Sequence, residues 1–428
     1  MQTVEYNQFS GEVHKRFGGK RAALDVSIEV TRRCPLDCLH CYNNLPMGDQ
    51  AARSQEMTFE EHCHLLDELV AEGCLWLLYS GGEIFARKDF LDIYTEAKKR
   101  GFLITLFTNG ILINERIADY LAKWPPFSIE ITLYGATRET YEALTQKPGS
   151  YDRCMRGIQL LLERNLPLKL KTVPTTINQH EVYAMKQMAQ DLGVDFKFDP
   201  LVNPRIDCSQ SPLAVRLTPE EAVALEFYDA KRKGDYRLLA ERDLAAPPSE
   251  PQGGKTRYSC GGGVQGCAID PTGTMSICVI SHQQGYNLRE GSFHEGWEGP
   301  LREIRLQPKT RPSICDRCGI QSLCSMCPAN GELENGDPES PVSFLCQIAH
   351  LRAYALGFEV PEHGDCECCK GGARHAELIS SAKRIADREP GVNLWEGGRP
   401  SSPVLNVLQP ASGCSSSGCN SCATHPGN

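Results

Sequence analysis

The sequence predicts an α/β fold, a partial (βα)6 TIM-like barrel followed by a Cys-rich, mostly irregular region. Three observations predict it. Short apolar runs alternate with amphipathic helical patterns from residue 25 to about 200, and strands that alternate with helices form parallel sheets. Glycines stand where these helices should end. Cysteines crowd between residues 260 and 369, where few periodic elements occur.

The barrel elements follow from apolar periodicity and from helix caps. Thr58 with Glu61 forms a capping-box pattern, and Gly73, Gly101 and Gly193 are expected to end helices before the next strand. In such barrels the chemistry lies at the carboxyl ends of the strands. The predicted strands are 25–30, 75–79, 102–107, 127–133, 168–173 and 194–198. The predicted helices are 59–72, 88–100, 114–123, 151–164, 179–191, 219–232, 236–244 and one within 370–390.

Changes in composition divide the chain into six expected segments. They are an N-terminal extension (1–24), the partial barrel (25–205), a helical linker region (206–258), the first Cys-rich domain (259–350), a Cys-rich and helical extension (351–390) and a Cys/Ser/Gly-rich tail (391–428), which we expect to be flexible.

Composition excludes several classes of protein. The 428 residues carry a net charge of −9, which argues against a nucleic-acid surface. The 21 cysteines are too sparse for a disulfide scaffold, and their odd number prevents complete internal pairing. No signal peptide and no apolar run long enough to span a membrane occurs. We therefore expect a cytoplasmic protein without a membrane or nucleic-acid partner, in which cysteines serve metal or redox chemistry.

Cys34, Cys38 and Cys41 form a C-x3-C-x2-C motif directly after the first strand. Three thiolates this close together suit an iron–sulfur cluster or zinc. A zinc site would need a fourth ligand, such as His40. A [4Fe–4S] cluster would keep one iron open for a substrate or cofactor.

This motif after strand one of a β/α chain resembles that of the radical S-adenosylmethionine (SAM) superfamily. Ser80-Gly81-Gly82-Glu83 after strand two resembles the family's GGE(P) motif, with Ile84 in place of Pro. The resemblance implies that the open iron chelates SAM and that Glu83 accepts from its ammonium group. Two glycines would let the backbone approach a ligand closely. The cofactor contacts it implies are Gly81, Gly82, Glu83, Asn109, Thr132 and Tyr42, with His40 and Tyr42 beside the adenine.

The later cysteines resemble the SPASM extension of radical SAM enzymes, which holds auxiliary iron–sulfur clusters. The spacing between Cys324 and Cys327 is two residues where the family has three. The resemblance implies two auxiliary [4Fe–4S] clusters, which with the SAM-binding cluster make three. Zinc ribbons are the alternative, because paired C-x2-C arms are common zinc ligands. The ligands implied for the first auxiliary cluster are Cys260, Cys267, Cys278 and Cys327, and those for the second are Cys315, Cys318, Cys324 and Cys346.

Ten cysteines remain outside these motifs. Four are expected to be small buried apolar residues: Cys63, Cys74, Cys154 and Cys208. Six match no motif, and metal binding, sulfur transfer, substrate mimicry and no function all stay open for them: Cys366, Cys368, Cys369, Cys414, Cys419 and Cys422.

The resemblance implies an oxidoreductase that cleaves SAM reductively to a 5′-deoxyadenosyl radical. SPASM-bearing relatives imply a peptide or protein substrate that is crosslinked or oxidised, as in ribosomal-peptide maturation. The alternatives are a sulfatase-type maturase, an enzyme acting on a cofactor precursor, and a non-catalytic zinc or electron-transfer protein. Expected partners are an electron donor such as flavodoxin or ferredoxin and, because only 33 residues precede Cys34, a separate leader-binding protein.

Overall fold

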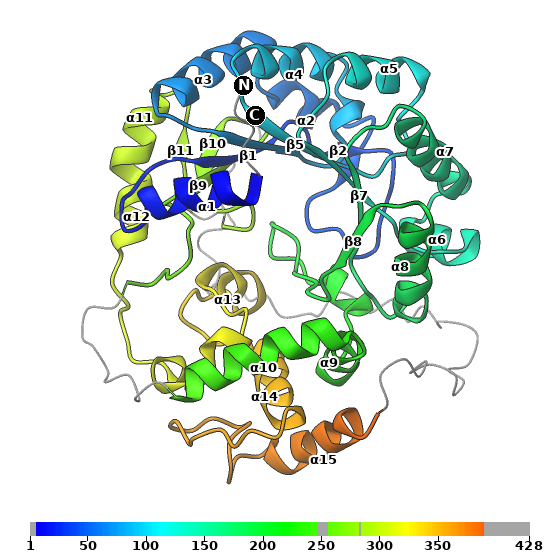
Figure 1. The fold of residues 1–428 in the computed structure, drawn as a ribbon. Helices are drawn as coiled ribbons and strands as arrows, with labels where there is room; N and C mark the ends of the chain where they lie inside the picture. Colours follow the sequence, from blue (N-terminus) through cyan, green and yellow to red (C-terminus); the bar gives the residue numbers. More distant parts are fainter. Residues whose placement is uncertain (1–5, 246–255, 282–283, 389–428) are drawn as a thin grey trace.

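The computed structural model describes residues 6–245, 256–281 and 284–388, which form a curved sheet with helices on its outer face and a second group of helices across its open side (Figure 1). Nine strands make the sheet, in the order β11-β10-β9-β1-β4-β5-β6-β7-β8. Their bounds are β1 Asp25–Glu29, β4 Trp76–Ser80, β5 Leu103–Thr108, β6 Ser128–Thr132, β7 Leu168–Thr172, β8 Asp195–Phe198, β9 Gly266–Ile269, β10 Thr274–Ser276 and β11 Tyr286–Asn287. β2 (Arg33–Cys34) and β3 (Leu45–Pro46) pair separately.

Seven of these strands are parallel, and β1 lies inside the sheet between β4 and β9. Val26 is opposite Leu77 of β4 and Cys267 of β9, so the Cys-rich region extends the barrel sheet directly. β10 and β11 continue the sheet in antiparallel register. The order places every barrel strand beside the next one in the sequence, as right-handed βα units do.

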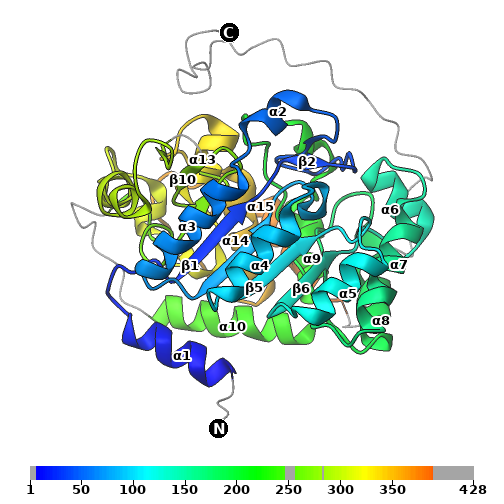
Figure 2. The same ribbon diagram turned by 90° about the horizontal axis from the view of Figure 1, so that it is seen from above.

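Helices α3, α4 and α5 lie along one face of the sheet (Figure 2). The barrel helices are α2 Gln50–Gln55, α3 Phe59–Ala71, α4 Phe90–Lys99, α5 Glu115–Lys123, α6 Arg138–Thr145, α7 Ser150–Leu162 and α8 Val182–Asp191. The others are α1 Tyr6–Arg16, α9 Pro219–Phe227, α10 Ala230–Ala245, α11 Phe293–Gly296, α12 Arg302–Leu306, α13 Pro328–Asn335, α14 Ser343–Ala355 and α15 His375–Ala386.

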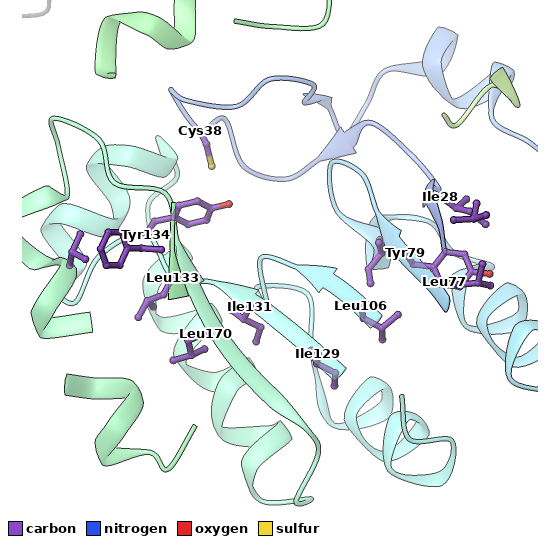
Figure 3. Close-up of a cluster of buried hydrophobic side chains, with 14 of the residues drawn as sticks. Ile28, Cys38, Leu77, Tyr79, Leu106, Ile129, Ile131, Leu133, Tyr134 and Leu170 are labelled. Atoms are coloured by element: carbon purple, nitrogen blue, oxygen red, sulfur yellow. The ribbon is translucent and has the colours of Figure 1, made fainter. Parts of the chain in front are cut away.

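The barrel core lies between the sheet and its outer helices. Alternate strand residues such as Ile28, Leu106, Ile129 and Leu170 are fully buried there, and Figure 3 shows them together with the Cys38 loop at one end of the cluster. Because side chains alternate across a strand, the residues between them face the concave side. That side carries polar groups, which positions them for a ligand.

A second apolar layer joins α9, α14 and α15. A buried ion pair crosses it: the Arg352 guanidinium on α14 donates to both carboxylate oxygens of Glu226 on α9, at 2.9 and 2.7 Å. Both side chains are almost fully buried. Figure 1 shows this layer on the open side of the barrel.

The six predicted strands are confirmed within one or two residues, and the fold class is confirmed. The capping box of Thr58 and Glu61 is present, and Gly73, Gly101 and Gly193 have positive φ angles of 79°, 88° and 71°. The sequence patterns did not predict α1, α2, α6, α11 to α14 or the strands β2, β3 and β9 to β11. The predicted helices 219–232 and 236–244 are α9 and α10, which are separated at residues 228–229 instead of 233–235. No described helix is long and apolar enough to cross a membrane. The six segment boundaries stay predictions, and the tail from residue 391 lies outside the described residues.

Candidate active site and cysteine groups

The first cysteine group lies on the loop after β1, at the carboxyl edge of the parallel strands. Cys34 and Cys38 are 7% and 9% exposed, and Cys38 interacts electrostatically with both Cys34 and Cys41. The Asn109 side chain donates to Cys34 Sγ at 3.5 Å, and the backbone N–H of Leu36 donates to the same sulfur at 3.4 Å. The structure thus brings the three motif cysteines together beside the end of β5.

Burial raises the pKa of all three thiols, and that of Cys34 reaches about 12. Because the thiolate is the form that binds metal, a positively charged metal centre has to offset the cost of deprotonating these buried groups. Three soft sulfur donors on one partly buried loop fit a [4Fe–4S] cluster with one iron open to another ligand.

Gly81 and Gly82 pack against the backbone that leads into Cys34. A Cβ on Gly82 would lie 2.7 Å from the Arg33 carbonyl oxygen and closer still to that of Arg32. The Gly82 N–H donates to the Thr31 carbonyl at 2.7 Å. The two glycines were predicted to let the backbone approach a ligand closely. In the structure their backbone closely approaches the segment that leads into the cysteine loop, and this contact holds that segment against the end of β4.

Glu83 is 1% exposed and its carboxylate accepts hydrogen bonds from three donors. Thr108 Oγ1 donates at 2.7 and 2.9 Å to the two oxygens, the Asn109 N–H donates at 2.8 Å, and the Phe85 N–H donates at 3.2 Å. Burial raises its pKa, and these donors oppose the rise. Glu83 thereby fixes the loop after β5, which in turn places Asn109 against Cys34.

Tyr42 and Asn43 are anchored to the end of β1. The Tyr42 hydroxyl and the Asn43 amide donate to Glu29 Oε1, at 2.8 and 2.6 Å. The His40 ring lies 5.5 Å from the Tyr134 ring, and burial lowers the pKa of His40 to about 4, so the ring is neutral. Among the described residues, His40 Nδ1 has no hydrogen-bond partner.

The concave side carries a group of charged side chains, of which the two lysines were not predicted from the sequence. Lys171 Nζ lies 3.4 Å from Glu130 Oε2 and 2.7 Å above the centre of the Phe107 ring, and Lys197 Nζ lies 2.8 Å from the same oxygen. Burial lowers the pKa of Lys171 to about 7, against the opposing effect of Glu130. The available signal was the alternation of leucine and lysine in β7, which places Lys171 next to the buried Leu170. Thr132 lies at the end of β6 and is half-buried.

Three of the four cysteines predicted for the first auxiliary cluster lie near one another. Cys327 interacts electrostatically with Cys278 and Cys260. Cys267 lies in β9, and the cysteine that interacts electrostatically with it is Cys74. The structure therefore brings Cys260, Cys278 and Cys327 together and places Cys267 in the sheet; its role as a ligand stays a prediction.

The four cysteines predicted for the second auxiliary cluster line one small cavity of about 30 Å³: Cys315, Cys318, Cys324 and Cys346. A larger neighbouring cavity of about 240 Å³ is lined by Cys315, Cys318, Cys324 and also Cys327. The two predicted auxiliary groups are thus adjacent. Burial raises the pKa of Cys324 to about 11, which again favours a metal centre over free thiolates.

Of the other cysteines, Cys74 and Cys154 are buried as predicted. The prediction is wrong for Cys63 and Cys208, which are half-buried: Cys63 lies on α3, and Cys208 takes a positive φ of 66° in a loop. Cys366, Cys368 and Cys369 are buried together beside Cys346. Cys414, Cys419 and Cys422 lie outside the described residues.

Two histidines near this last group were not predicted as site residues. His350 on α14 and His363 in the following loop lie among the buried cysteines. The available signal was a C-x2-C pair, Cys366 and Cys369, with His363 three residues before it.

Comparison with known proteins identifies the barrel. Residues 28–189 match the family model described as the radical SAM superfamily. The "AdoMet-dependent heme synthase" of Methanosarcina barkeri is 25% identical over 73% of this chain and 93% of its own length. The "PqqA peptide cyclase" of Granulibacter bethesdensis is 29% identical over 79% of this chain and 93% of its own length.

The fold is also that of a solved structure, Streptococcus suis SuiB bound to the precursor peptide SuiA. The TM-score is 0.59 at 17% identity, and the match covers 79% of this chain and 80% of SuiB. The same protein with S-adenosylmethionine bound matches with a TM-score of 0.56. The matched region includes Cys34, Cys38, Cys41 and the Gly-Gly-Glu segment, and a radical SAM fold implies SAM and a [4Fe–4S] cluster. The chain is a radical SAM superfamily enzyme, related to peptide maturases and haem synthases.

Proposed function

We propose that this enzyme is a radical SAM maturase that crosslinks or oxidises a peptide. The observation that carries the proposal is the convergence of three cysteines, two of them buried, with the Gly-Gly-Glu segment and the loop after β5 at one edge of the sheet. Cys34, Cys38 and Cys41 would hold the SAM-binding [4Fe–4S] cluster. Bound there and reduced, the cluster would supply the electron for cleavage of SAM to a 5′-deoxyadenosyl radical, and hydrogen abstraction from the substrate would follow.

The chain's own residues position the reactants. Gly82 and Glu83 fix the cysteine loop and the loop after β5 relative to each other. Asn109 follows β5, Thr132 ends β6 and Tyr42 lies on the cysteine loop, and SAM would contact all three. Lys171, Lys197 and Glu130 present charge on the concave face, where a polar substrate segment would bind. The helical layer lies across the open side of the barrel (Figure 1), where it would partly cover a bound substrate.

The auxiliary cysteines support the same reaction. A substrate radical must lose an electron to become a closed-shell product, and protein-ligated clusters beside the barrel would accept it. We assign Cys260, Cys267, Cys278 and Cys327 to one such cluster. Cys315, Cys318, Cys324 and Cys346 are assigned to the other. The full enzyme would then contain about 12 irons in three clusters. A flavodoxin or ferredoxin as donor, a separate leader-binding protein and a cytoplasmic location complete the proposal.

Anaerobic incubation of the reduced enzyme with SAM tests the radical step. We expect 5′-deoxyadenosine from the wild type and from Cys63→Ala, which changes a half-buried cysteine on α3. Cys34→Ala should abolish the product. Zinc in place of iron, or unchanged product formation by Cys34→Ala, would contradict the proposal.

Substrate class needs a second test, because similarity to a haem synthase favours a cofactor precursor as the other candidate. Co-expression with short peptides encoded beside the gene should yield a peptide that has lost two hydrogens. The same enzyme supplied with a porphyrin precursor should leave it unchanged. An unmodified peptide together with a modified porphyrin precursor would contradict the peptide proposal and would show that the substrate is a cofactor precursor.

A further inference from the structure

The loop between α14 and α15 buries an unusual number of metal-binding side chains. Residues 356–374 contain no helix or strand, yet His363, Cys366 and Cys369 in this loop are 3%, 3% and 2% exposed. His350 on α14 faces them and is fully buried. Burying three polar groups in a loop against a fourth on α14 is costly unless they find partners, and the side-chain contacts of the two histidines include the cysteine sulfurs.

The donor atoms of the four residues lie close enough together to share one ion. His350 Nε2 lies 3.4 Å from Cys369 Sγ and 3.8 Å from Cys366 Sγ. His363 contacts Cys369 Sγ through Nδ1 at 3.3 Å and through Nε2 at 4.0 Å. One ligand atom from each of the four residues lies within 4.8 Å of all the others. Two ligands of a tetrahedral zinc ion are about 3.4–3.8 Å apart, from bond lengths of about 2.0–2.3 Å.

The orientation of His350 is also that of a ligand. Its Nδ1 lies 2.8 Å from the Cys346 carbonyl oxygen, so Nδ1–H donates there and Nε2 presents its lone pair to the two sulfurs. His363 Nδ1 lies 2.9 Å from the Pro361 carbonyl oxygen, which in the same way leaves Nε2 as the acceptor nitrogen. Metal-bound histidines characteristically donate their other N–H to a backbone carbonyl.

We propose that His350, His363, Cys366 and Cys369 form a zinc site of the Cys2His2 type, separate from the iron–sulfur clusters. A tetrahedral site with two sulfur and two nitrogen donors suits zinc. The ion would tie the loop to α14, directly behind the cysteines of the second auxiliary group.

A rival set shares two of these residues. Cys346, His350, Cys366 and Cys368 also place four donors within 4.8 Å, and Cys346 Sγ lies 3.9 Å from Cys366 Sγ. That set would take Cys346 away from the cavity that it lines with Cys315, Cys318 and Cys324. The Cys2His2 set leaves all four of those cysteines available, and for that reason we assign the zinc to it. Cys368 then has no ligand role and serves as the matched control.

Metal content of the full chain, purified anaerobically, tests the assignment without any use of SAM. We expect about one zinc per wild-type chain, and a loss of about tenfold or more in Cys369→Ala and His363→Ala. Iron content should stay at the wild-type value in both. Cys368→Ala should keep its zinc. A wild type without zinc, zinc loss in Cys368→Ala with retention in Cys369→Ala, or iron lost together with zinc would overturn the proposal.

A variant that keeps four ligands guards against misfolding of the alanine variants. In the cobalt-substituted enzyme, His363→Cys would replace a nitrogen donor by a third sulfur. We expect the metal to remain bound and the sulfur-to-cobalt charge-transfer absorption to increase relative to wild type. An unchanged cobalt spectrum would show that His363 is not a ligand, and the assignment would be wrong.

Discussion

Gly82→Ala should disable the SAM-binding cluster while leaving the rest of the enzyme intact. The new Cβ would lie 2.7 Å from both the Arg32 carbonyl carbon and the Arg33 carbonyl oxygen. Ordinary contact begins near 3.4 Å, so β4 and the cysteine loop must separate by roughly 1 Å. Gly82 does not have a positive φ, so the effect would be steric rather than conformational. A misplacement of this size costs a reaction about 100-fold.

The assay is iron content followed by 5′-deoxyadenosine formation. Iron should fall by about four per chain, and the product rate by about 100-fold or more. Gly48→Ala is the matched control, because Gly48 follows β3 on the same loop and a Cβ there would meet nothing within 4 Å. Full iron loading and a wild-type rate in Gly82→Ala would refute the role given to this contact.

Two further predictions concern charged groups. Because burial lowers the pKa of Lys171 to about 7 from 10.5, the unfolded chain binds more protons between these values. Stability should therefore rise with pH across this window, by at most about 1.4 kcal/mol per unit. Lys171→Met should remove that slope in denaturant unfolding, and an equal slope in both proteins would contradict it. Glu226→Ala should lower the free energy of unfolding by about 3–5 kcal/mol, since it strands a buried guanidinium. The double variant Glu226→Leu/Arg352→Met should lose less free energy of unfolding than Glu226→Ala, because it leaves no buried charge unpaired. An equal loss in both variants would show that side-chain packing, and not the unpaired charge, causes the destabilisation.

The barrel was predictable because its signals are local. Each of the six strands is a short run of continuous or alternating apolar residues, and the predicted glycines Gly73, Gly101 and Gly193 precede β4, β5 and β8 in the structure. The motif cysteines were found by their spacing and Glu83 by its resemblance to a family motif, and they meet because the carboxyl ends of parallel strands share one edge.

What the sequence could not show depends on long-range pairing. β9 bonds to β1 across about 240 residues, and nothing in the segment Gly266–Ile269 distinguishes it from a loop. The partners of Glu83 were equally hidden, because Thr108 and Asn109 lie on the next strand. His350 and Cys369 come together only because the loop folds back on α14.

One strand links the SAM-binding site to the auxiliary cysteines. β1 ends in the loop that carries Cys34, and its two edges pair with β4 and with β9, the strand that opens the Cys-rich part of the sheet. A strand bonded on both edges cannot slide past one neighbour without breaking hydrogen bonds to the other. The separation between the SAM-binding cysteines and those after β9 is therefore set by sheet register. If the auxiliary clusters accept an electron from the substrate, as we propose, that role requires such a fixed separation, because a hinged domain would vary the distance in every turnover.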